Sequence, residues 1–436
     1  MAKPVIVVHY HELWLKGRNR NFFLAKLRLA LARSLEDLGV ERIGRPGDRM
    51  IIELGDCARV EEAIERLKCV LGVAYFAVAR RVERDMDAIC RAAWDEIKPE
   101  KFSSFAVRAK RSDKSFPVPV MEIEQVVGRY LLERLREAGR DVRVNLDSPE
   151  ITCRIEIPPG PALVYARKIA GPGGLPANSG GRMMCLLSGG FDSAVAAYKM
   201  MKRGAHITFV HFWGGGARPG ESSVHVARAL ARKLVPYQLT AKLYLVPFEP
   251  LQREIVQWAP ETYRVLLYRR LMLRIAEQLA YRDHAQALVT GDSLAQVASQ
   301  TLQNMVAVGA ASRLPVFRPL AGDDKLEILA LARKIGTHDI SAEPFHDCCP
   351  VFMPRTPALY ASVEELDRAE VALDAGVASP FRATSSNHSP GSGIAVLVRY
   401  GVEAAQLERF RYSSGRVEQV DSFRPAAAPT ARSARA

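Results

Sequence analysis

Hydrophobic and polar positions follow a regular rhythm from the start of the chain. Residues 4–8 form a short apolar run typical of a buried strand. Residues 21–38 place leucine or phenylalanine every three or four positions, which predicts an amphipathic helix. A strand over 50–54 and a helix over 59–68 follow. This order predicts a small α+β domain of ferredoxin-like type over residues 1–75.

A second α+β domain is predicted over residues 76–168. Its expected elements are a strand at 104–108, a helix near 121–138, and strands near 151–156 and 162–166. Residues 169–182 are rich in glycine and proline, so we expect a linker there.

Strands and helices alternate strictly after this linker. Strands are expected at 183–187, 207–212, 243–247, 287–290 and 315–318. Helices are expected at 192–203, 222–235, 261–281, 293–303 and 324–335. This rhythm predicts an α/β catalytic domain with a doubly wound parallel sheet over residues 183–379. Residues 380–436 fit no domain pattern, and their low-complexity end is typical of disorder.

Composition narrows the class of protein. The 436 residues are 48% hydrophobic and 25% charged, which is ordinary for a soluble protein of several domains. No apolar run is long enough to span a bilayer, so we expect no membrane partner. Seven cysteines, an odd number and mostly scattered, argue against a disulfide framework and favour the cytoplasm. A net charge of +13 suits a polyanionic partner such as nucleic acid.

The sharpest motif lies between an expected strand and an expected helix. Its residues are Leu186, Leu187, Ser188, Gly189, Gly190, Asp192 and Ser193. They resemble the pyrophosphate loop (PP-loop) of ATP pyrophosphatases, which implies that they bind the phosphates of ATP. The glycines allow a tight turn, and backbone N–H groups at the start of the helix then face an anion. Asp192 is expected either to cap the helix or to help hold Mg²⁺. The lysine of a Walker A loop is absent.

Further candidates for ATP binding follow other strands. His211 and Phe212 end the second strand at the carboxyl edge, where such sheets bind ligands. Gly291 follows a later strand, and Gln300 is predicted to share a helix face with Gln296. The adjacent Arg269 and Arg270 are candidates for pairing with phosphate, the alternative being a solvated helix face.

Two adjacent cysteines, Cys348 and Cys349, lie between prolines after the βαβ region. The second Cys/His pair of a zinc site is missing. A thiolate here is a candidate carrier of persulfide sulfur, with His346 lowering its pKa, and an inert pair is the alternative. Cys185 lies in the strand before the phosphate loop and is expected in the core.

Together these segments resemble the tRNA 4-thiouridine synthetase family, which also serves thiamine thiazole synthesis. The resemblance rests on 12–23, 169–176, 186–193, 291–302, 318–320, 324–325, 335–337 and 347–349. It implies a THUMP RNA-binding domain at 76–168 and a PP-loop ATP pyrophosphatase domain (adenine nucleotide alpha hydrolase-like) at 183–379. It also implies that ATP, with Mg²⁺, adenylylates O4 of uridine 8 in tRNA and that persulfide sulfur from a cysteine desulfurase replaces this oxygen.

The resemblance also assigns residues. Cys348 matches the active cysteine, Asp192 and Lys325 fall in catalytic segments, and Cys349 occupies a variable position. Because no cysteine follows Cys349, an active rhodanese domain is absent, and the resolving thiol would be Cys349, Cys185 or an external reductant. A homodimer is one option that the sequence leaves open.

Two basic clusters are candidates for contacting tRNA phosphates, with a solvated basic loop as the alternative. The first is Arg108, Lys110, Arg111 and Lys114, and the second is Lys16, Arg18 and Arg20. Two other functions compete: another PP-loop enzyme that modifies tRNA or adenylylates a substrate, and a non-catalytic THUMP RNA-binding protein.

Overall fold

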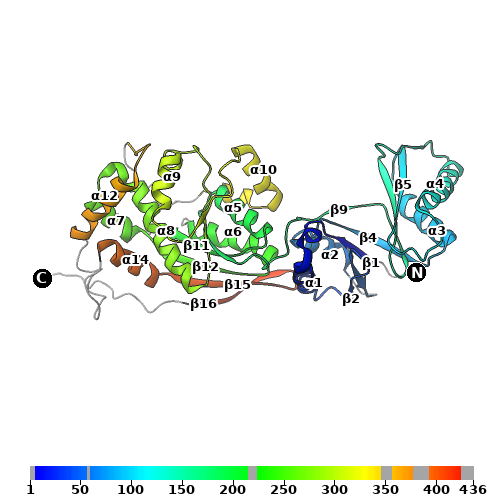
Figure 1. The fold of residues 1–436 in the computed structure, drawn as a ribbon, viewed down its shortest axis with the longest axis horizontal. Helices are drawn as coiled ribbons and strands as arrows, with labels where there is room; N and C mark the ends of the chain where they lie inside the picture. The colour runs from blue at the N-terminus through cyan, green and yellow to red at the C-terminus, as the bar shows by residue number, and fades with distance from the viewer. Residues whose placement is uncertain (1–4, 56–58, 215–222, 345–355, 377–391, 424–436) are drawn as a thin grey trace. The chain divides into compact units, whose positions relative to one another are not determined.

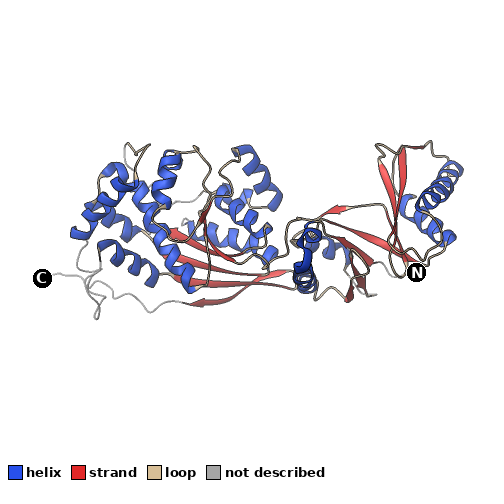
Figure 2. Cartoon of the chain, viewed as in Figure 1, coloured by secondary structure: helices blue, strands red, loops and turns tan. Residues whose placement is uncertain are grey.

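The computed structural model describes residues 5–55, 59–214, 223–344, 356–376 and 392–423. The chain divides into two compact units, Met1–Pro176 and Ala177–Ala436. Each unit is built on one β-sheet with helices packed against it (Figure 1 and Figure 2). None of the described helices is both long and apolar enough to cross a membrane.

Unit 1 has a nine-stranded sheet in the order β2-β3-β1-β4-β8-β7-β5-β6, with β9 paired to β4. Its strands are β1 (Val5–His9), β2 (Val40–Gly44), β3 (Met50–Leu54), β4 (Tyr75–Val82), β5 (Ser104–Arg111), β6 (Arg143–Val144), β7 (Ile151–Ile157), β8 (Ala162–Tyr165) and β9 (Ile169–Ala170). Its helices are the 3-10 helix η1 (Glu12–Asn19), α1 (Arg20–Ser34), α2 (Val60–Leu67), α3 (Met86–Ile97) and α4 (Val120–Glu137).

Strand β4 joins the two halves of this sheet. Tyr75–Ala79 pair with β1, whereas Arg80–Val82 pair with β8. A single strand therefore runs through the boundary expected after residue 75. Apolar side chains collect in one core under α1 and α2 and in a second core under α3 and α4. The sequence pattern missed β2, β4 and α3.

Unit 2 has a seven-stranded sheet in the order β14-β13-β10-β11-β12-β15-β16. Its strands are β10 (Arg182–Leu186), β11 (His206–Trp213), β12 (Thr240–Pro247), β13 (Leu288–Val289), β14 (Val316–Phe317), β15 (Gln406–Ser413) and β16 (Arg416–Phe423). Strands β10 to β14 pair in parallel, as the strand–helix alternation predicted.

Helices cover this parallel sheet on both sides (Figure 2). Helix α5 packs against β10 and β11, the neighbouring α6 packs against β11 and β12, and α8 packs with α14. The helices are α5 (Phe191–Lys202), α6 (Ser223–Gln238), α7 (Glu249–Trp258), η2 (Glu261–Tyr263), α8 (Arg264–Arg282), η3 (Ala298–Gln300), α9 (Leu302–Gly309), α10 (Lys325–Ile335), α11 (His338–Ala342), α12 (Val363–Gly376) and α14 (Gly393–Glu403). The doubly wound fold class is confirmed.

The prediction of a helix over residues 293–303 is wrong. Residues 293–297 form a loop, the short η3 follows at Ala298–Gln300, and α9 begins only at Leu302. Ala295 has a positive φ of 60°, which interrupts any helix, and the Thr301 side chain caps α9 by accepting from the Asn304 backbone N–H. Gln296 and Gln300 therefore do not share a helix face.

The segment left unassigned by its sequence contributes to unit 2. Strand β15 pairs antiparallel with β12, and β16 pairs antiparallel with β15. Arg228 on α6 holds Glu408 of β15 through two hydrogen bonds of 2.9 and 2.6 Å to Oε1. Residues 406–423 therefore extend the sheet beyond the parallel strands. Residues 424–436 lie outside the described part of the chain.

A cluster of buried charges joins the two halves of unit 1. The Arg49 side chain is fully buried and forms an ion pair with Glu156 of β7. Arg49 also donates to Ser112 Oγ at 2.6 Å, and Tyr165 O–H donates to Glu156 Oε1 at 2.6 Å. Because Arg49 precedes β3 and its partners follow β5 or lie on β7, the cluster fixes one half of the sheet against the other.

Replacing Arg49 by Met should destabilise unit 1 by about 3–5 kcal/mol, because the Glu156 carboxylate would stay buried without its cation. Urea unfolding of the full chain measures this change. The exposed pair Lys98–Asp95 supplies the control, and Lys98→Met should cost about 1 kcal/mol or less. The double variant Arg49→Met/Glu156→Leu should recover much of the loss. Equal effects of Arg49→Met and Lys98→Met would contradict this role.

Candidate functional site

The phosphate loop connects β10 to α5 at the carboxyl edge of the parallel sheet. Gly190 is the N-cap residue of α5 and has no side chain with which to cap the first N–H groups of the helix. Those N–H groups have no partner within the helix, so they can receive an anion. Asp192 lies inside the first turn and does not cap the helix. The loop can therefore receive an anion at the start of α5.

The two serines of the loop hold its shape. Their hydroxyl groups, on Ser188 and Ser193, lie 3.0 Å apart. The backbone N–H of Ser188 donates to Ser193 Oγ at 3.0 Å, and that of Gly190 donates to Ser188 Oγ at 3.2 Å. We expected both hydroxyls to serve as anion donors. Their contacts within the loop give them an additional structural role.

Gly291 allows the loop after β13 to approach the start of α5. A Cβ at position 291 would lie 2.6 Å from the backbone N of Ser193 and 2.8 Å from the carbonyl carbon of Asp192. Backbone atoms cannot yield at such distances. Any larger residue at this position would push the two loops apart and distort the anion site.

Asp192 faces two side chains from other elements. Lys325 Nζ contacts Asp192 Oδ1 at 2.6 Å, and Gln296 Nε2 donates to Asp192 Oδ2 at 3.2 Å. Lys325 is the first residue of α10, where Asp324 and Glu327 form a capping box that fixes the helix start. The Lys325 side chain is 44% exposed, so its ammonium group remains accessible to a ligand at the phosphate loop.

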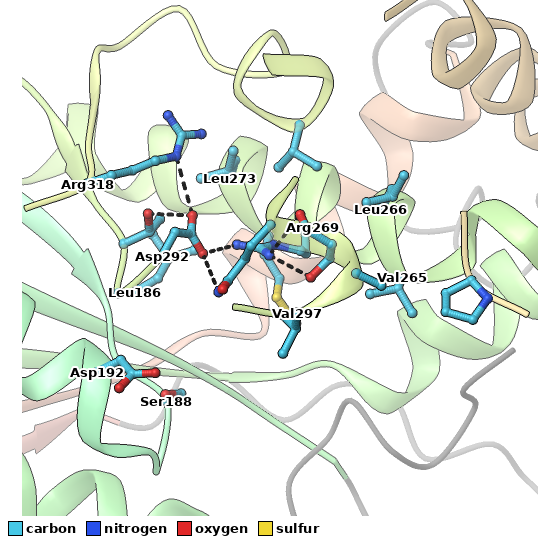
Figure 3. A pocket seen from close by; sticks show the side chains of 18 of the residues that line it. Leu186, Ser188, Asp192, Val265, Leu266, Arg269, Leu273, Asp292, Val297 and Arg318 are labelled. Carbon is cyan, nitrogen blue, oxygen red and sulfur yellow. Dashed lines mark hydrogen bonds and ion pairs between the residues drawn. The ribbon is translucent and has the colours of Figure 1, made fainter. Parts of the chain in front are cut away.

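A second carboxylate, Asp292, gathers the cations of the site (Figure 3). It forms an ion pair with Arg269, and Arg318 Nε lies 3.4 Å from Oδ2. Thr290 Oγ1 donates to Oδ2 at 2.8 Å, and Gln300 Nε2 donates to Oδ1 at 3.3 Å. Asp292 thus orients two guanidinium groups and one amide.

Opposing effects act on the pKa of the buried Asp292 carboxyl. Burial by itself raises the pKa, but the positive charge of Arg269 and the hydrogen bond from Thr290 lower it below its usual value overall. Asp292 is therefore ionised at neutral pH, and it balances the charge of the arginines around it.

These groups line a cavity of about 520 Å³ in unit 2. Its polar end contains Ser188, Asp192 and Gly291, and its other end is largely apolar, between the start of α8 and Pro357. Gln300 Oε1 is buried and has no hydrogen-bond partner in the described protein. An unpaired buried acceptor is costly, which suits a ligand that donates a hydrogen bond there.

The structure brings seven of the predicted ATP-binding residues to this cavity: Leu186, Ser188, Asp192, Ser193, Arg269, Gly291 and Gln300. Lys325 reaches it through Asp192. Asp292 and Arg318 were not singled out from the sequence. The signal that would have indicated Asp292 is its place directly after a parallel strand, at the edge where such sheets bind ligands.

Six predicted residues do not line the cavity. Three of them, Leu187, Gly189 and Gly190, belong to the phosphate loop itself, and the other three lie elsewhere. Arg270 is 1% exposed and binds Glu370 on α12, with Nε at 2.8 Å from Oε1, so its side chain is already held by protein groups. The ring of His211 contacts Leu187 O at 2.7 Å through Nδ1 and Ser223 Oγ at 2.8 Å through Nε2. Phe212 packs against the Phe248 ring in the core. Only the backbone of His211 and Phe212 remains as a candidate for contacting a nucleotide.

Of the three cysteines with a predicted role, only Cys185 lies in the described part of the chain. Cys185 is fully buried, and burial raises the pKa of its thiol to about 12. It remains a thiol at neutral pH, which does not suit a resolving nucleophile. The predicted sulfur carriers, Cys348 and Cys349, lie outside the described residues, as does His346. The described chain resumes at Thr356, and the next two residues, Pro357 and Ala358, line the cavity.

The basic clusters of unit 1 are only partly free for RNA. Lys110 forms an ion pair with Asp48, and Arg111 Nη1 donates to Phe116 O at 2.8 Å. Arg108 Nη2 donates to Leu146 O at 2.6 Å, whereas Lys114 is exposed.

In the second cluster, cations lie over aromatic rings. Arg20 lies 3.5 Å from the ring centre of Trp14, and Lys16 lies 5.2 Å from that of Phe23. Arg18 is exposed.

Comparison with known proteins agrees with this geometry. Three family models match the chain: the ThiI ferredoxin-like domain over residues 5–77, the THUMP domain over 83–166, and the Thiamine biosynthesis protein (ThiI) over 178–374. A probable tRNA sulfurtransferase of Thermus thermophilus is 44% identical over 86% of this chain and 90% of its own length. A probable tRNA sulfurtransferase of Geobacillus kaustophilus is 41% identical over 85% of this chain and 91% of its own length.

Two solved structures are similar to this chain over most of its length. A 4-thiouridine synthetase crystallised with RNA and ATP has a TM-score of 0.79 and 29% identity, covering 93% of this chain and 99% of its own. The PH1313 protein from Pyrococcus horikoshii, at a TM-score of 0.56 and 22% identity, covers 76% of this chain and 99% of its own and shares the fold. The chain belongs to the tRNA sulfurtransferase family.

Proposed function

We propose that this chain uses ATP to adenylylate O4 of uridine 8 in tRNA and then replaces that oxygen with persulfide sulfur, which gives 4-thiouridine. One observation carries the proposal: an uncapped helix N-terminus opens onto the same cavity as the Asp192–Lys325 pair. A phosphate loop without a Walker lysine suits release of pyrophosphate. The similar structure with bound RNA and ATP supports the same two substrates.

In the first step, O4 of uridine attacks the α-phosphorus of ATP, and pyrophosphate leaves. The N–H groups at the start of α5 hold the phosphates, and Lys325 offers a positive charge beside them. Mg²⁺ accompanies ATP in this proposal. It is usually held by phosphates, water and one or two carboxylates, and Asp192 supplies one carboxylate next to the loop.

Arg269 and Gln300 are proposed to hold the nucleoside part of ATP. Both are oriented by Asp292, and the unpaired Oε1 of Gln300 offers an acceptor for an N–H donor such as an amino group. The apolar side of the cavity, formed by residues such as Leu186 and Leu273, suits a flat base. The backbone of His211 and Phe212 is a further candidate contact.

In the second step, the terminal sulfur of a Cys348 persulfide attacks C4 of the adenylylated uridine. AMP leaves with the former O4, a proton is released, and C4 is joined to Cys348 through a disulfide. A second thiol then attacks the Cys348 sulfur. The S–S bond breaks, the sulfur stays on C4 as 4-thiouridine, and Cys348 forms a disulfide with the attacking thiol. Cys349 or an external thiol takes this role, and a thiol reductant restores the enzyme.

A cysteine desulfurase is proposed to load the persulfide directly onto Cys348. The same persulfide is a candidate sulfur source for the thiamine thiazole. Thiol chemistry of this kind suits the reducing cytoplasm. A homodimer remains compatible with the proposal.

Pyrophosphate release measured with ATP and with or without tRNA tests the proposed function. We expect release that depends on tRNA, together with 4-thiouridine in the tRNA once a desulfurase and cysteine are added. Release without any sulfur in the tRNA would favour another PP-loop tRNA-modifying or adenylylating enzyme. Binding of tRNA without release would favour a non-catalytic THUMP RNA-binding protein.

Asp192→Ala should reduce tRNA-dependent pyrophosphate release by about a hundredfold, because it removes the carboxylate that is proposed to hold Mg²⁺ and that orients Lys325. Binding of tRNA should change little. Asp421→Ala on β16, whose side chain is 61% exposed, is the matched control and should behave as wild type. Wild-type pyrophosphate release by Asp192→Ala would contradict a role of the phosphate loop in the reaction.

Cys348→Ala should abolish 4-thiouridine formation while pyrophosphate release continues. Cys349→Ala should have a milder effect, because an external thiol can resolve the disulfide. Cys185→Ala should retain thiolation, since its buried thiol has a pKa raised to about 12 by burial. Nucleoside analysis of the treated tRNA measures all three variants, and full thiolation by Cys348→Ala would show that sulfur takes another route.

Lys114→Gln should weaken tRNA binding and reduce the slope of log K against log salt by about one, because one phosphate contact releases about one counterion. Lys114 tests this surface more cleanly than Lys110 or Arg111, which have protein partners. Lys98→Gln in the same unit is the control. An unchanged slope for Lys114→Gln would place the RNA surface elsewhere, with Arg18 as the next position to test.

A further inference from the structure

A second cavity lies in unit 1, on the face of the sheet opposite the core under α1 and α2. Its volume is about 300 Å³. Three arginines line it, Arg42 on β2, Arg45 just after β2 and Arg81 on β4, together with one carboxylate, Glu53 on β3. The charged side chains of the lining therefore carry a net charge of +2, three positive against one negative. We call this cavity the arginine pocket.

A β-bulge turns Arg42 toward the arginine pocket. The register between β2 and β3 shifts between Val40 and Arg42. Val40 and Ile43 both pack against the core under α1 and α2, although they are three positions apart. In an unbroken strand side chains alternate between the two faces, so Arg42 would share the face of Val40. The bulge places Arg42 on the opposite face instead, where the pocket lies.

The charged residues of β3 and β4 reach the same face by ordinary alternation. Ile51 and Ala79 pack in the small core on the side of the sheet away from α1 and α2. Glu53 and Arg81 lie two positions further along these strands and therefore point to that side as well. Arg81 Nη1 lies 3.6 Å from Glu53 Oε2, which is a long contact for an ion pair. Glu53 thus restrains Arg81 only loosely.

The arginines of the pocket remain accessible to a ligand. Arg42 and Arg45 are exposed, and no hydrogen bond or ion pair holds either side chain within the described part of the chain. The Arg81 side chain is 44% exposed. A guanidinium group presents a planar fork of N–H donors that matches the oxygens of a phosphate. The pocket therefore suits a phosphate group.

A rigid turn forms another wall of the pocket. Pro158, Pro159 and Pro161 line it from the turn between β7 and β8. Each proline ring fixes its own φ and holds the preceding residue in an extended conformation, so this wall needs little ordering when a ligand binds. The turn lies in the segment matched by the THUMP model, whereas Arg42 and Arg45 lie in the segment matched by the ferredoxin-like model. Residues from both domains therefore build the pocket.

We propose that the arginine pocket binds a phosphate of the tRNA backbone. This inference rests on the proposed function for the identity of the RNA. Exposed arginines give a single free phosphate ion little affinity in water. A tRNA phosphate has a higher effective concentration there, because other parts of the same RNA are held elsewhere on the chain. A backbone contact of this kind positions the RNA against both domains of unit 1 without reading its sequence.

The double variant Arg42→Gln/Arg45→Gln should weaken tRNA binding by on the order of tenfold at low salt. The slope of log K against log salt should fall by about one, because one phosphate contact is lost. Arg42→Lys/Arg45→Lys keeps the charges and should keep the slope. Arg59→Gln is the matched control, since Arg59 is 53% exposed in the same unit but is paired with Asp37 and Glu62.

Glu53→Gln tests the same pocket in the opposite direction. It removes the one negative charge of the lining and releases Arg81 with little change in shape. Binding of tRNA should become tighter by about threefold, because a repulsive charge next to the phosphate is gone. Damage to the fold would weaken binding, so tighter binding reports the charge of the pocket. Thermal unfolding of each variant measures its folded fraction.

An unchanged salt slope in Arg42→Gln/Arg45→Gln, or weaker tRNA binding by Glu53→Gln, would overturn the proposal. Titration with inorganic phosphate separates the two sources of the anion. Phosphate binding that is lost in the double variant, while its tRNA binding matches wild type, would assign the pocket to a free anion and would also overturn the proposal. A wild-type chain that binds tRNA but forms no 4-thiouridine would overturn the proposed function alone, and a chain that binds no tRNA would overturn both.

Discussion

The site depends on N–H groups at the start of α5 that no side chain in the described part of the chain caps. Gly190 occupies the capping position, so the helix begins with its positive end open toward the cavity. Ser188 and Ser193 hold the turn in place, and Gly291 lets the next loop approach without a steric clash. This arrangement can receive an anion, and we propose that the phosphates of ATP fill it.

Buried carboxylates form ion pairs at two other important places in the molecule. Asp292 keeps Arg269 and Arg318 at the cavity, and its own charge is maintained by theirs. Away from the cavity, Glu156 and Arg49 serve a different purpose, because they join the two halves of the sheet in unit 1. In both places a buried ion pair fixes the position of elements that are distant in sequence, at the cost of removing charges from water.

Much of the fold and part of the site could be predicted from sequence because they depend on local pattern. The motif from Leu186 to Ser193 shows its strand, turn and helix directly, and the structure places it accordingly. The helical pattern of hydrophobic residues does not predict which of the adjacent Arg269 and Arg270 faces the cavity. One faces the cavity and the other is held by Glu370, a hundred positions further along the chain.

Other features escaped prediction because their causes are tertiary. The expected helix over 293–303 gives way to a loop, in which Ala295 has a positive φ and Thr301 caps the later start of α9. The contacts of Asn304 with Ala358 and Ala361 likewise leave no local pattern. Residues 406–423 read as an unassigned tail because antiparallel pairing with β12 depends on a strand far back in the chain.

Nucleoside analysis of tRNA from cells with and without this chain tests the central claim most directly. The account predicts 4-thiouridine in tRNA when the chain is present, its loss when the chain is deleted, and its return with the wild-type chain but not with Asp192→Ala. Equal amounts of 4-thiouridine in the presence and absence of the chain, in cells with no second copy of the gene, would contradict it.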